Sequence, residues 1–315
     1  MEILVAVGLL ILGFVFLIKG ADFFVDGASS VAKMLRVPSL IIGMTIVAMG
    51  TSLPELSVSV TASINNSNAL AISNVIGSNI FNLMVVLGAA ALIAPLKVGR
   101  ETLRRDYPFS VICSVLLLIL GFIGMELGRI DGLIFLGAFV GFLTYEVRSA
   151  VKARNAASSE DTEDEKVLPV WLSIIYIVGG AAAVKFGGDW VVNGAVTIAK
   201  AFGLSENLIG LTIVACGTSL PELVTSIMAA KKNELDMAIG NVVGSNVFNV
   251  LMILGVASAI SPIPFISENM IDIAVLLGFS LLTWLFCKTN ESIRKREGAA
   301  MLVCYFVYLG YICVR

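Results

Sequence analysis

The sequence predicts an all-α membrane protein of ten transmembrane helices, arranged as two inverted repeats of five helices each. The composition is 58% hydrophobic and only 14% charged, whereas a soluble domain carries about 25% charged residues. Its apolar stretches are long enough to cross a bilayer as helices. The polar motifs of the first half recur in the second, so that Glu55 aligns with Glu222. Together these features predict a duplicated, multi-span membrane protein.

Hydropathy and the spacing of charges divide the chain into ten candidate spans. The first follows Met1 and Glu2 without a basic leader or a small-residue cleavage site, so we interpret it as a membrane helix rather than a signal peptide. The predicted spans cover Ile3–Ile18, Val37–Ile64, Ala69–Leu96, Tyr107–Met125, Ile130–Val147, Val170–Val192, Asn207–Ala229, Met237–Ile260, Ile271–Cys287 and Gly298–Val314.

The spans group into a first five-helix repeat over residues 1–148, a linker over 149–167 and a second repeat over 168–315. The linker contains the acidic run Ser158–Glu165, a composition typical of a solvated, flexible segment. A regulatory Ca²⁺ site in this run is an alternative interpretation, although the run lacks an EF-hand pattern.

The distribution of Lys and Arg predicts the orientation. The loops after spans 1, 3, 5, 7 and 9 carry sixteen of these residues, and the opposite face carries three. Positively charged loops stay in the cytoplasm, so both termini are expected outside it, in a multi-pass protein of the cell (plasma or inner) membrane. Five helices is an odd number, so the two halves are inserted upside down relative to each other. Inverted repeats of this kind are typical of secondary transporters.

One stretch places a carboxylate inside the predicted membrane in each half. It is Gly50-Thr-Ser-Leu-Pro-Glu55-Leu56 in the first half and Gly217-Thr-Ser-Leu-Pro-Glu222-Leu223 in the second. A buried carboxylate is costly unless it is paired, which makes it a functional-site candidate. The preceding proline breaks the helix and frees a backbone carbonyl. Oxygen ligands of this kind suit Na⁺ and Ca²⁺. The alternative is a buried structural hydrogen bond.

A polar stripe follows each of these motifs. Asn74, Ser78 and Asn82 are spaced at four-residue intervals on an apolar helix, and the block recurs as Asn241–Asn249. Polar residues of this kind can simply bond one membrane helix to another. Beside a buried glutamate and a proline break, we interpret them as part of an ion site.

Charges near the ends of the first and sixth spans allow two interpretations. Lys19 and Lys185 are expected to extend towards the interface or to pair with Asp22 and Asp189. Alternatively, Asp22, Asp26 and Asp189 line a path for ions.

The doubled G-T-S-L-P-E and the doubled G-S-N-x-F-N resemble the α-repeats of the sodium/calcium exchangers and the wider cation/Ca²⁺ antiporter superfamily, especially its compact prokaryotic members. The motifs that carry the resemblance span Gly43–Gly88 and Gly210–Gly255. The resemblance implies a secondary active antiporter that exchanges Na⁺ for Ca²⁺ by alternating access, not an enzyme, with no cofactor besides the transported ions. It also implies that helices 2, 3, 7 and 8 form the core and that helices 1 and 6 slide across it.

The resemblance further implies four cation sites in a diamond, with Asn82 and Asn249 at the centre. Ca²⁺ would bind the carboxylates of Glu55 and Glu222 and the carbonyls of Thr51 and Thr218. One Na⁺ site would use Ala48, Thr51, Ser52, Glu55 and Ser78, and its mirror Ala215, Thr218, Ser219, Glu222 and Ser245. Many family members have Asp where this chain has Asn249, so the site here carries two formal negative charges.

Several alternatives remain open at this stage. Two close glutamates in a low dielectric readily take up protons, so H⁺ is a second candidate for the counter-ion, and K⁺ is a candidate co-ion. A cation channel is disfavoured because the motif occurs twice in one chain rather than in a ring of subunits. An intramembrane enzyme is disfavoured because the chain contains no histidine. The net charge of −2, without a basic patch, argues against a nucleic-acid partner, and no protein partner is implied.

Overall fold

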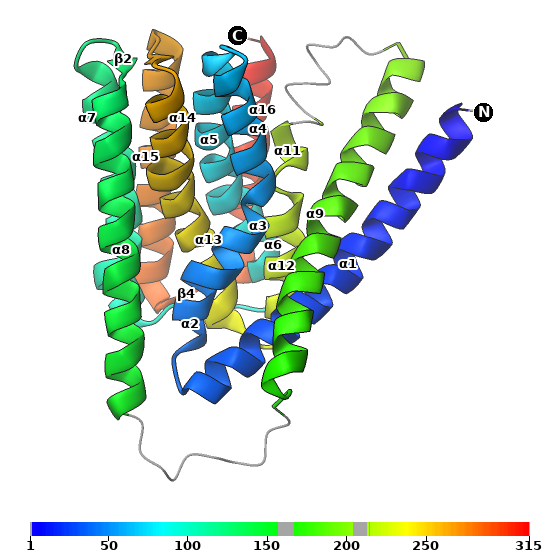
Figure 1. Cartoon of the computed structure of the whole chain (residues 1–315), viewed down its shortest axis with the longest axis vertical. Helices are drawn as coiled ribbons and strands as arrows, with labels where there is room; N and C mark the ends of the chain where they lie inside the picture. The colour runs from blue at the N-terminus through cyan, green and yellow to red at the C-terminus, as the bar shows by residue number, and fades with distance from the viewer. Residues whose placement is uncertain (1, 157–166, 204–212, 214, 315) are drawn as a thin grey trace.

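The computed structural model describes residues 2–156, 167–203, 213 and 215–314. Over these ranges the chain is helical, apart from connecting turns and four strands of two residues each. A bundle of helices forms the larger part of the molecule, and two long tilted helices, α1 and α9, lie together along one side of it (Figure 1). The all-α membrane fold predicted from composition is therefore confirmed.

The tilted pair consists of α1 (Glu2–Leu35) and α9 (Val170–Ala201). The two helices run in opposite directions (Figure 1) and approach closely at glycines. A Cβ on Gly20 would lie 2.8 Å from the Cβ of Ala183, so only glycine allows this spacing. The predicted ends of both helices were wrong, because the charged residues after Ile18 and after Val192 continue the helices instead of ending them.

A break interrupts the second span of each half. In the first half α4 bends by 49° from the helices before it. Ser52 lies at the bend with φ −83° and ψ 12°, and Pro54 occupies the first turn of α4, where its missing N–H is not needed. The elements are α2 (Ser39–Ile42), the π-helix η1 (Gly43–Val47), α3 (Ala48–Thr51) and α4 (Leu53–Ile64), and in the second half α11 (Ala215–Gly217) and α12 (Leu220–Lys231).

The next span of each half contains a π-helical segment that begins at an asparagine, Asn82 in one half and Asn249 in the other. Such segments widen a helix by one residue per turn and are frequent at functional sites. The elements are α5 (Asn68–Phe81), η2 (Asn82–Val86) and α6 (Leu87–Ile93), and then α13 (Leu235–Phe248), η5 (Asn249–Leu254) and α14 (Gly255–Ile260).

Four helices surround these spans, and two short antiparallel strand pairs join the halves. Strand β1 (Leu96–Lys97) pairs with β4 (Ser292–Ile293), and β2 (Glu126–Leu127) pairs with β3 (Ile263–Pro264). The surrounding elements are the π-helix η3 (Thr102–Asp106) with α7 (Tyr107–Phe122), α8 (Arg129–Ala156), α15 (Ser267–Asn290) and α16 (Lys295–Val314).

Eight helices in the described ranges are long and apolar enough to cross a membrane, and the bent pair from Ser39 to Ile64 would make a ninth. The predicted span Asn207–Ala229 lies partly outside the described residues. Helix α8 continues to Ala156, so the predicted start of the linker at Ser149 falls within a helix. The acidic run Ser158–Glu165 lies outside the described residues. The start of α1 and the end of α16 lie at the same end of the molecule (Figure 1).

The spans Asn68–Ile93 and Leu235–Ile260 lie at the centre. In their most apolar windows 72% and 78% of the residues are buried, against 22–39% for the other six spans. They share one large apolar core with the helices around them. Two smaller apolar clusters, one around Phe24 and one around Leu17, separately join α1 and α9 to the bundle.

Candidate cation-binding site

The two glutamates begin short helices that follow a break. Glu55 lies in the first turn of α4 and Glu222 in the first turn of α12. Both carboxylates are fully buried. The N-terminus of a helix carries a partial positive charge, which helps to hold a carboxylate in its ionised form. The proline break therefore places both acids at the N-terminus of a helix in the interior.

Each glutamate binds a serine from the opposite half. Ser52 Oγ donates to Glu222 Oε1 at 2.7 Å, and Ser219 Oγ donates to Glu55 Oε1 at 2.9 Å. These bonds join residues 170 and 164 positions apart in the chain. The two broken spans therefore meet at the carboxylates, as the duplicated motif predicts.

The central helices supply a second serine to each side. Ser52 also contacts Ser245 at 3.0 Å between hydroxyl oxygens, and Ser219 contacts Ser78 at 3.1 Å. The resemblance groups Ser52 with Glu55, but its hydroxyl lies with Glu222 instead. The hydrogen bonds therefore join Ser52 to Glu222 and Ser245, and Ser219 to Glu55 and Ser78, so each serine of a broken span contacts side chains of the opposite half.

Asparagines fix the backbone around the glutamates. Asn74 Nδ2 donates to Ser59 Oγ at 3.0 Å and to the Glu55 carbonyl at 3.4 Å, and Asn74 Oδ1 accepts from Thr218 at 3.4 Å. The second half repeats the arrangement with Asn241, which bonds Ser226, the Glu222 carbonyl and Thr51. These two side chains hold the backbone around the glutamates and are satisfied by protein atoms.

The central asparagines bond across the halves. Asn82 Nδ2 donates to Asn246 Oδ1 at 3.2 Å, and Asn249 Nδ2 donates to Asn79 Oδ1 at 3.0 Å. Sequence reasoning singled out Asn82 and Asn249 but missed the roles of Asn79 and Asn246. The signal was present, because the residue after the serine in G-S-N-x-F-N is asparagine in both copies.

Four buried oxygens at this centre lack a hydrogen-bond partner among the described residues: Glu55 Oε2, Glu222 Oε2, Asn82 Oδ1 and Asn249 Oδ1. An unpartnered buried acceptor costs about 1–3 kcal/mol, and more when it is charged. A hard cation with oxygen ligands would satisfy such a set. The donor set of two carboxylates with amide, hydroxyl and carbonyl oxygens fits Ca²⁺ or Na⁺.

The other predicted ligands lie a few residues before Glu55 or Glu222 in the sequence. Ala48 and Thr51 are buried at the end of the first broken segment, and Thr218 and Ser219 occupy the break in the second. Ala215 begins α11, and its side chain lies outside the described part. Within the described ranges, no group of three His, Cys, Asp or Glu side chains could hold a metal.

The family model for the sodium/calcium exchanger protein matches residues 5–148 and 172–314. The chain belongs to the sodium/calcium exchanger family. It is therefore a transporter of the cation/Ca²⁺ exchanger group, and not a member of an enzyme family. The two matched segments correspond to the two halves that share the site, and the unmatched residues between them include the predicted linker.

Three relatives illustrate matches that extend over most of both chains. The sodium/calcium exchanger MaX1 of Methanosarcina acetivorans is 32% identical, covering 96% of each chain. The inner membrane protein YrbG of Escherichia coli is 36% identical, covering 89% of each. A solved structure of the sodium-calcium exchanger NCX_Mj, soaked with Na⁺ and Sr²⁺, superposes with a TM-score of 0.85 at 34% identity and covers 98% of each chain.

Outside the site, one predicted ion pair of this transporter forms and another does not. Lys185 Nζ lies 2.8 Å from Asp189 Oδ2, which confirms the prediction for α9. Asp22 was expected to pair with Lys19, but Lys232 binds it at 2.7 Å. Lys232 lies far away in the sequence, at the end of α12, so hydropathy and local spacing gave no indication of this contact.

Proposed function

We propose that this transporter is a secondary active antiporter that exports Ca²⁺ in exchange for Na⁺ entry by alternating access. The observation that carries the proposal is the set of four unpartnered oxygens from Glu55, Glu222, Asn82 and Asn249. They belong to both halves and lie within a network of hydrogen bonds that crosses between the halves. Such a centre is suited to cations that come and go, because its own side chains leave these oxygens unsatisfied.

In this proposal the carboxylates of Glu55 and Glu222, with the carbonyls of Thr51 and Thr218, bind Ca²⁺. The Na⁺ sites follow the observed contacts rather than the division by halves. One combines Glu55 with Ser78, Thr218, Ser219 and Ala215, and its mirror combines Glu222 with Ser245, Thr51, Ser52 and Ala48.

Coupling follows from mutual exclusion at shared ligands. With Asn249 in place of Asp, the site carries two formal charges, which one Ca²⁺ or two Na⁺ ions neutralise. An empty pair of ionised glutamates inside the membrane is costly, so the protein changes its open side readily only when loaded. Binding of one ion therefore requires the other to leave, and the two fluxes are linked.

The proposed topology is ten helices in two inverted repeats, with the second, third, seventh and eighth at the core and both termini outside the cytoplasm. It is supported by the opposite directions of α1 and α9 and by the common end for the start of α1 and the end of α16 (Figure 1). The charge bias of the loops orients the molecule. The relative named an inner membrane protein supports the proposed location.

The test is isotopic Ca²⁺ uptake into liposomes with Na⁺, K⁺ and H⁺ gradients applied one at a time. We expect uptake with a Na⁺ gradient alone. Uptake with only a pH gradient would instead assign H⁺ as the counter-ion, and a requirement for K⁺ would make it a co-ion. Glu55→Gln and Glu222→Gln are each expected to abolish uptake, since each variant removes one of the two negative charges that would neutralise the bound Ca²⁺. Full transport by either variant would refute the site.

A further inference from the structure

The α1/α9 pair packs against the bundle at an interface that is separate from the large core, and we call this interface the seam. The two helices pack tightly on each other at glycines, whereas the large core lies entirely within the bundle. Among the described residues, the apolar packing between the pair and the bundle includes two small clusters, one around Phe24 and one around Leu17. Packed interfaces between such bodies tend to switch between discrete arrangements. Polar contacts that cross this seam therefore affect which arrangement is preferred.

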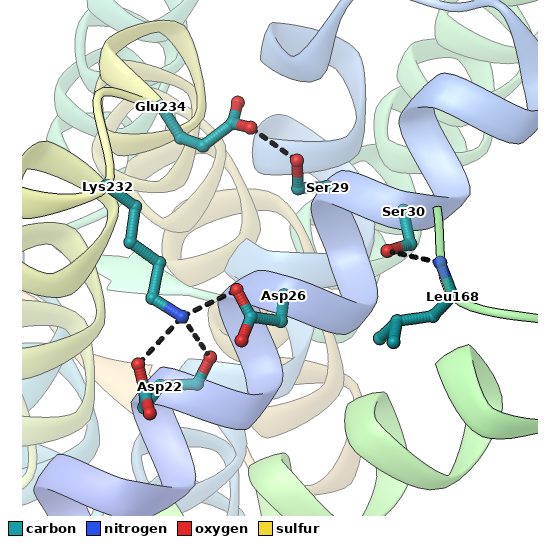
Figure 2. Close-up of polar contacts among 7 residues, drawn as sticks. All are labelled: Asp22, Asp26, Ser29, Ser30, Leu168, Lys232 and Glu234. Atoms are coloured by element: carbon teal, nitrogen blue, oxygen red, sulfur yellow. Dashed lines mark hydrogen bonds and ion pairs between the residues drawn. The ribbon is translucent and has the colours of Figure 1, made fainter. Parts of the chain in front are cut away.

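One lysine crosses the seam with three contacts to α1. Lys232, at the end of α12, places its Nζ 2.7 Å from Asp22 Oδ1, 2.9 Å from the Asp22 carbonyl and 2.5 Å from Asp26 Oδ1 (Figure 2). The lysine side chain is 24% exposed and those of the two aspartates 29% and 45%. The contact is therefore partly shielded from water, and it binds the loop after α12 to α1.

Neighbouring contacts reinforce this connection. Glu234, in the same loop, accepts a hydrogen bond from Ser29 on α1, and the backbone N–H of Leu168 donates to Ser30 Oγ (Figure 2). These residues line a polar cavity of about 520 Å³. The cluster lies at the end of the molecule where α8 ends and α9 begins, which we call the linker end (Figure 1).

The other half cannot build the same connection. The positions that correspond to Lys232 and Glu234 in the repeat are Asn65 and Ser67, and the counterpart of Asp26 is Asn193. The counterpart of Asp22 is Asp189, which pairs with Lys185 on its own helix, α9. Apart from Asp189, the residues of this charged connection therefore have no charged equivalents at the repeat-related positions, in a molecule whose ion site is nearly symmetric.

We propose that Lys232, Asp22 and Asp26 form a one-sided latch that holds α1 against the bundle at the linker end and favours the state closed at that end. The inference rests on the alternating access of the proposed function. Exposed ion pairs contribute about 0.2–1 kcal/mol each, and two pairs that share one lysine do not add in full. Releasing the latch is therefore expected to shift the balance between the two states by about two- to tenfold.

The first experiment measures transport from each face. Half-saturating Ca²⁺ is compared in vesicles that present the linker end and in vesicles that present the opposite end. Lys232→Gln is expected to lower the half-saturating concentration at the linker end by about two- to tenfold relative to the opposite end. Lys185→Gln is the matched control, since it breaks an ion pair that stays within α9, and it leaves the ratio unchanged. The exchange of charges in Lys232→Asp/Asp26→Lys restores the ratio towards wild type.

The second experiment does not depend on transport. Val25 is fully buried and lines the cavity at the seam, so Val25→Cys is labelled by a maleimide only when the seam opens. We expect Lys232→Gln to raise the labelling rate of this cysteine by about two- to tenfold and Lys185→Gln to leave it unchanged, after subtraction of labelling in the parent without Val25→Cys. An unchanged rate in Lys232→Gln would overturn the latch. Absence of Ca²⁺ flux in the wild type would overturn the proposed function instead.

Discussion

Gly217, in the broken span of the second half, packs directly against α9. A methyl group added at this position should therefore push the tilted pair away from the bundle. A Cβ on Gly217 would lie 2.2 Å from Cγ2 of Val192 on α9, far inside van der Waals contact. Overpacking of this kind costs about 1–3 kcal/mol. We therefore expect Gly217→Ala to lower the melting temperature in detergent by roughly 2–12 °C and to slow Ca²⁺ uptake, although it changes no ligand oxygen.

The structure supplies both a rescue and a control. In Gly217→Ala/Val192→Ala the nearest atom to the new methyl group is the Cβ of residue 192, at 3.4 Å, which is an ordinary contact. The double variant should therefore recover most of the lost stability. Gly179→Ala adds a methyl group to the same helix α9 where nothing lies within 4 Å, and it should be neutral or slightly stabilising. The reasoning would be refuted by a Gly217→Ala protein as stable as wild type, or by failure of Val192→Ala to restore it.

Two further predictions concern the polar centre. Ser52→Ala and Ser219→Ala each remove a donor to a buried carboxylate, a bond worth about 1.5–3 kcal/mol, so the Na⁺ dependence of Ca²⁺ flux should weaken about tenfold or more in each; a large difference between the two would contradict the symmetry of the site. Asn249→Asp adds a third carboxylate and removes the donor to Asn79 Oδ1, so without ions it should be about 1–3 kcal/mol less stable, and Ca²⁺ should raise its melting temperature more than that of wild type. Equal stability without ions would count against this assignment.

The sequence allowed the main features of the site to be predicted because the informative residues are polar and duplicated. Two acids in apolar runs, each after a proline, have few arrangements that avoid exposing charge to lipid, and meeting across two halves is one of them. The repeat aligned Glu55 with Glu222 and Asn82 with Asn249 without any coordinates. These residues lie on the central spans and on the broken spans that pack against them, as expected.

Features that depend on contacts across the molecule could not be predicted. Asp22 and Asp26 appeared to end the first helix because hydropathy counts charge without knowing its partner, and Lys232 supplies that partner from the other half. The contacts of Ser52 and Ser219 with the glutamate of the opposite half could not be predicted for a similar reason. Residue spacing fixes which face of a helix a hydroxyl occupies, but not which neighbour that face meets.

The serine of each broken span binds the glutamate of the other broken span, so neither copy of the duplicated segment forms a complete site by itself. A tandem duplication usually creates functional redundancy, because the second copy can compensate for an inactivating change in the first. Here that redundancy is lost. An inactivating change in either copy is expected to disable both. On the proposed inverted topology, two separately expressed fragments would regain activity only by associating in opposite orientations within one bilayer.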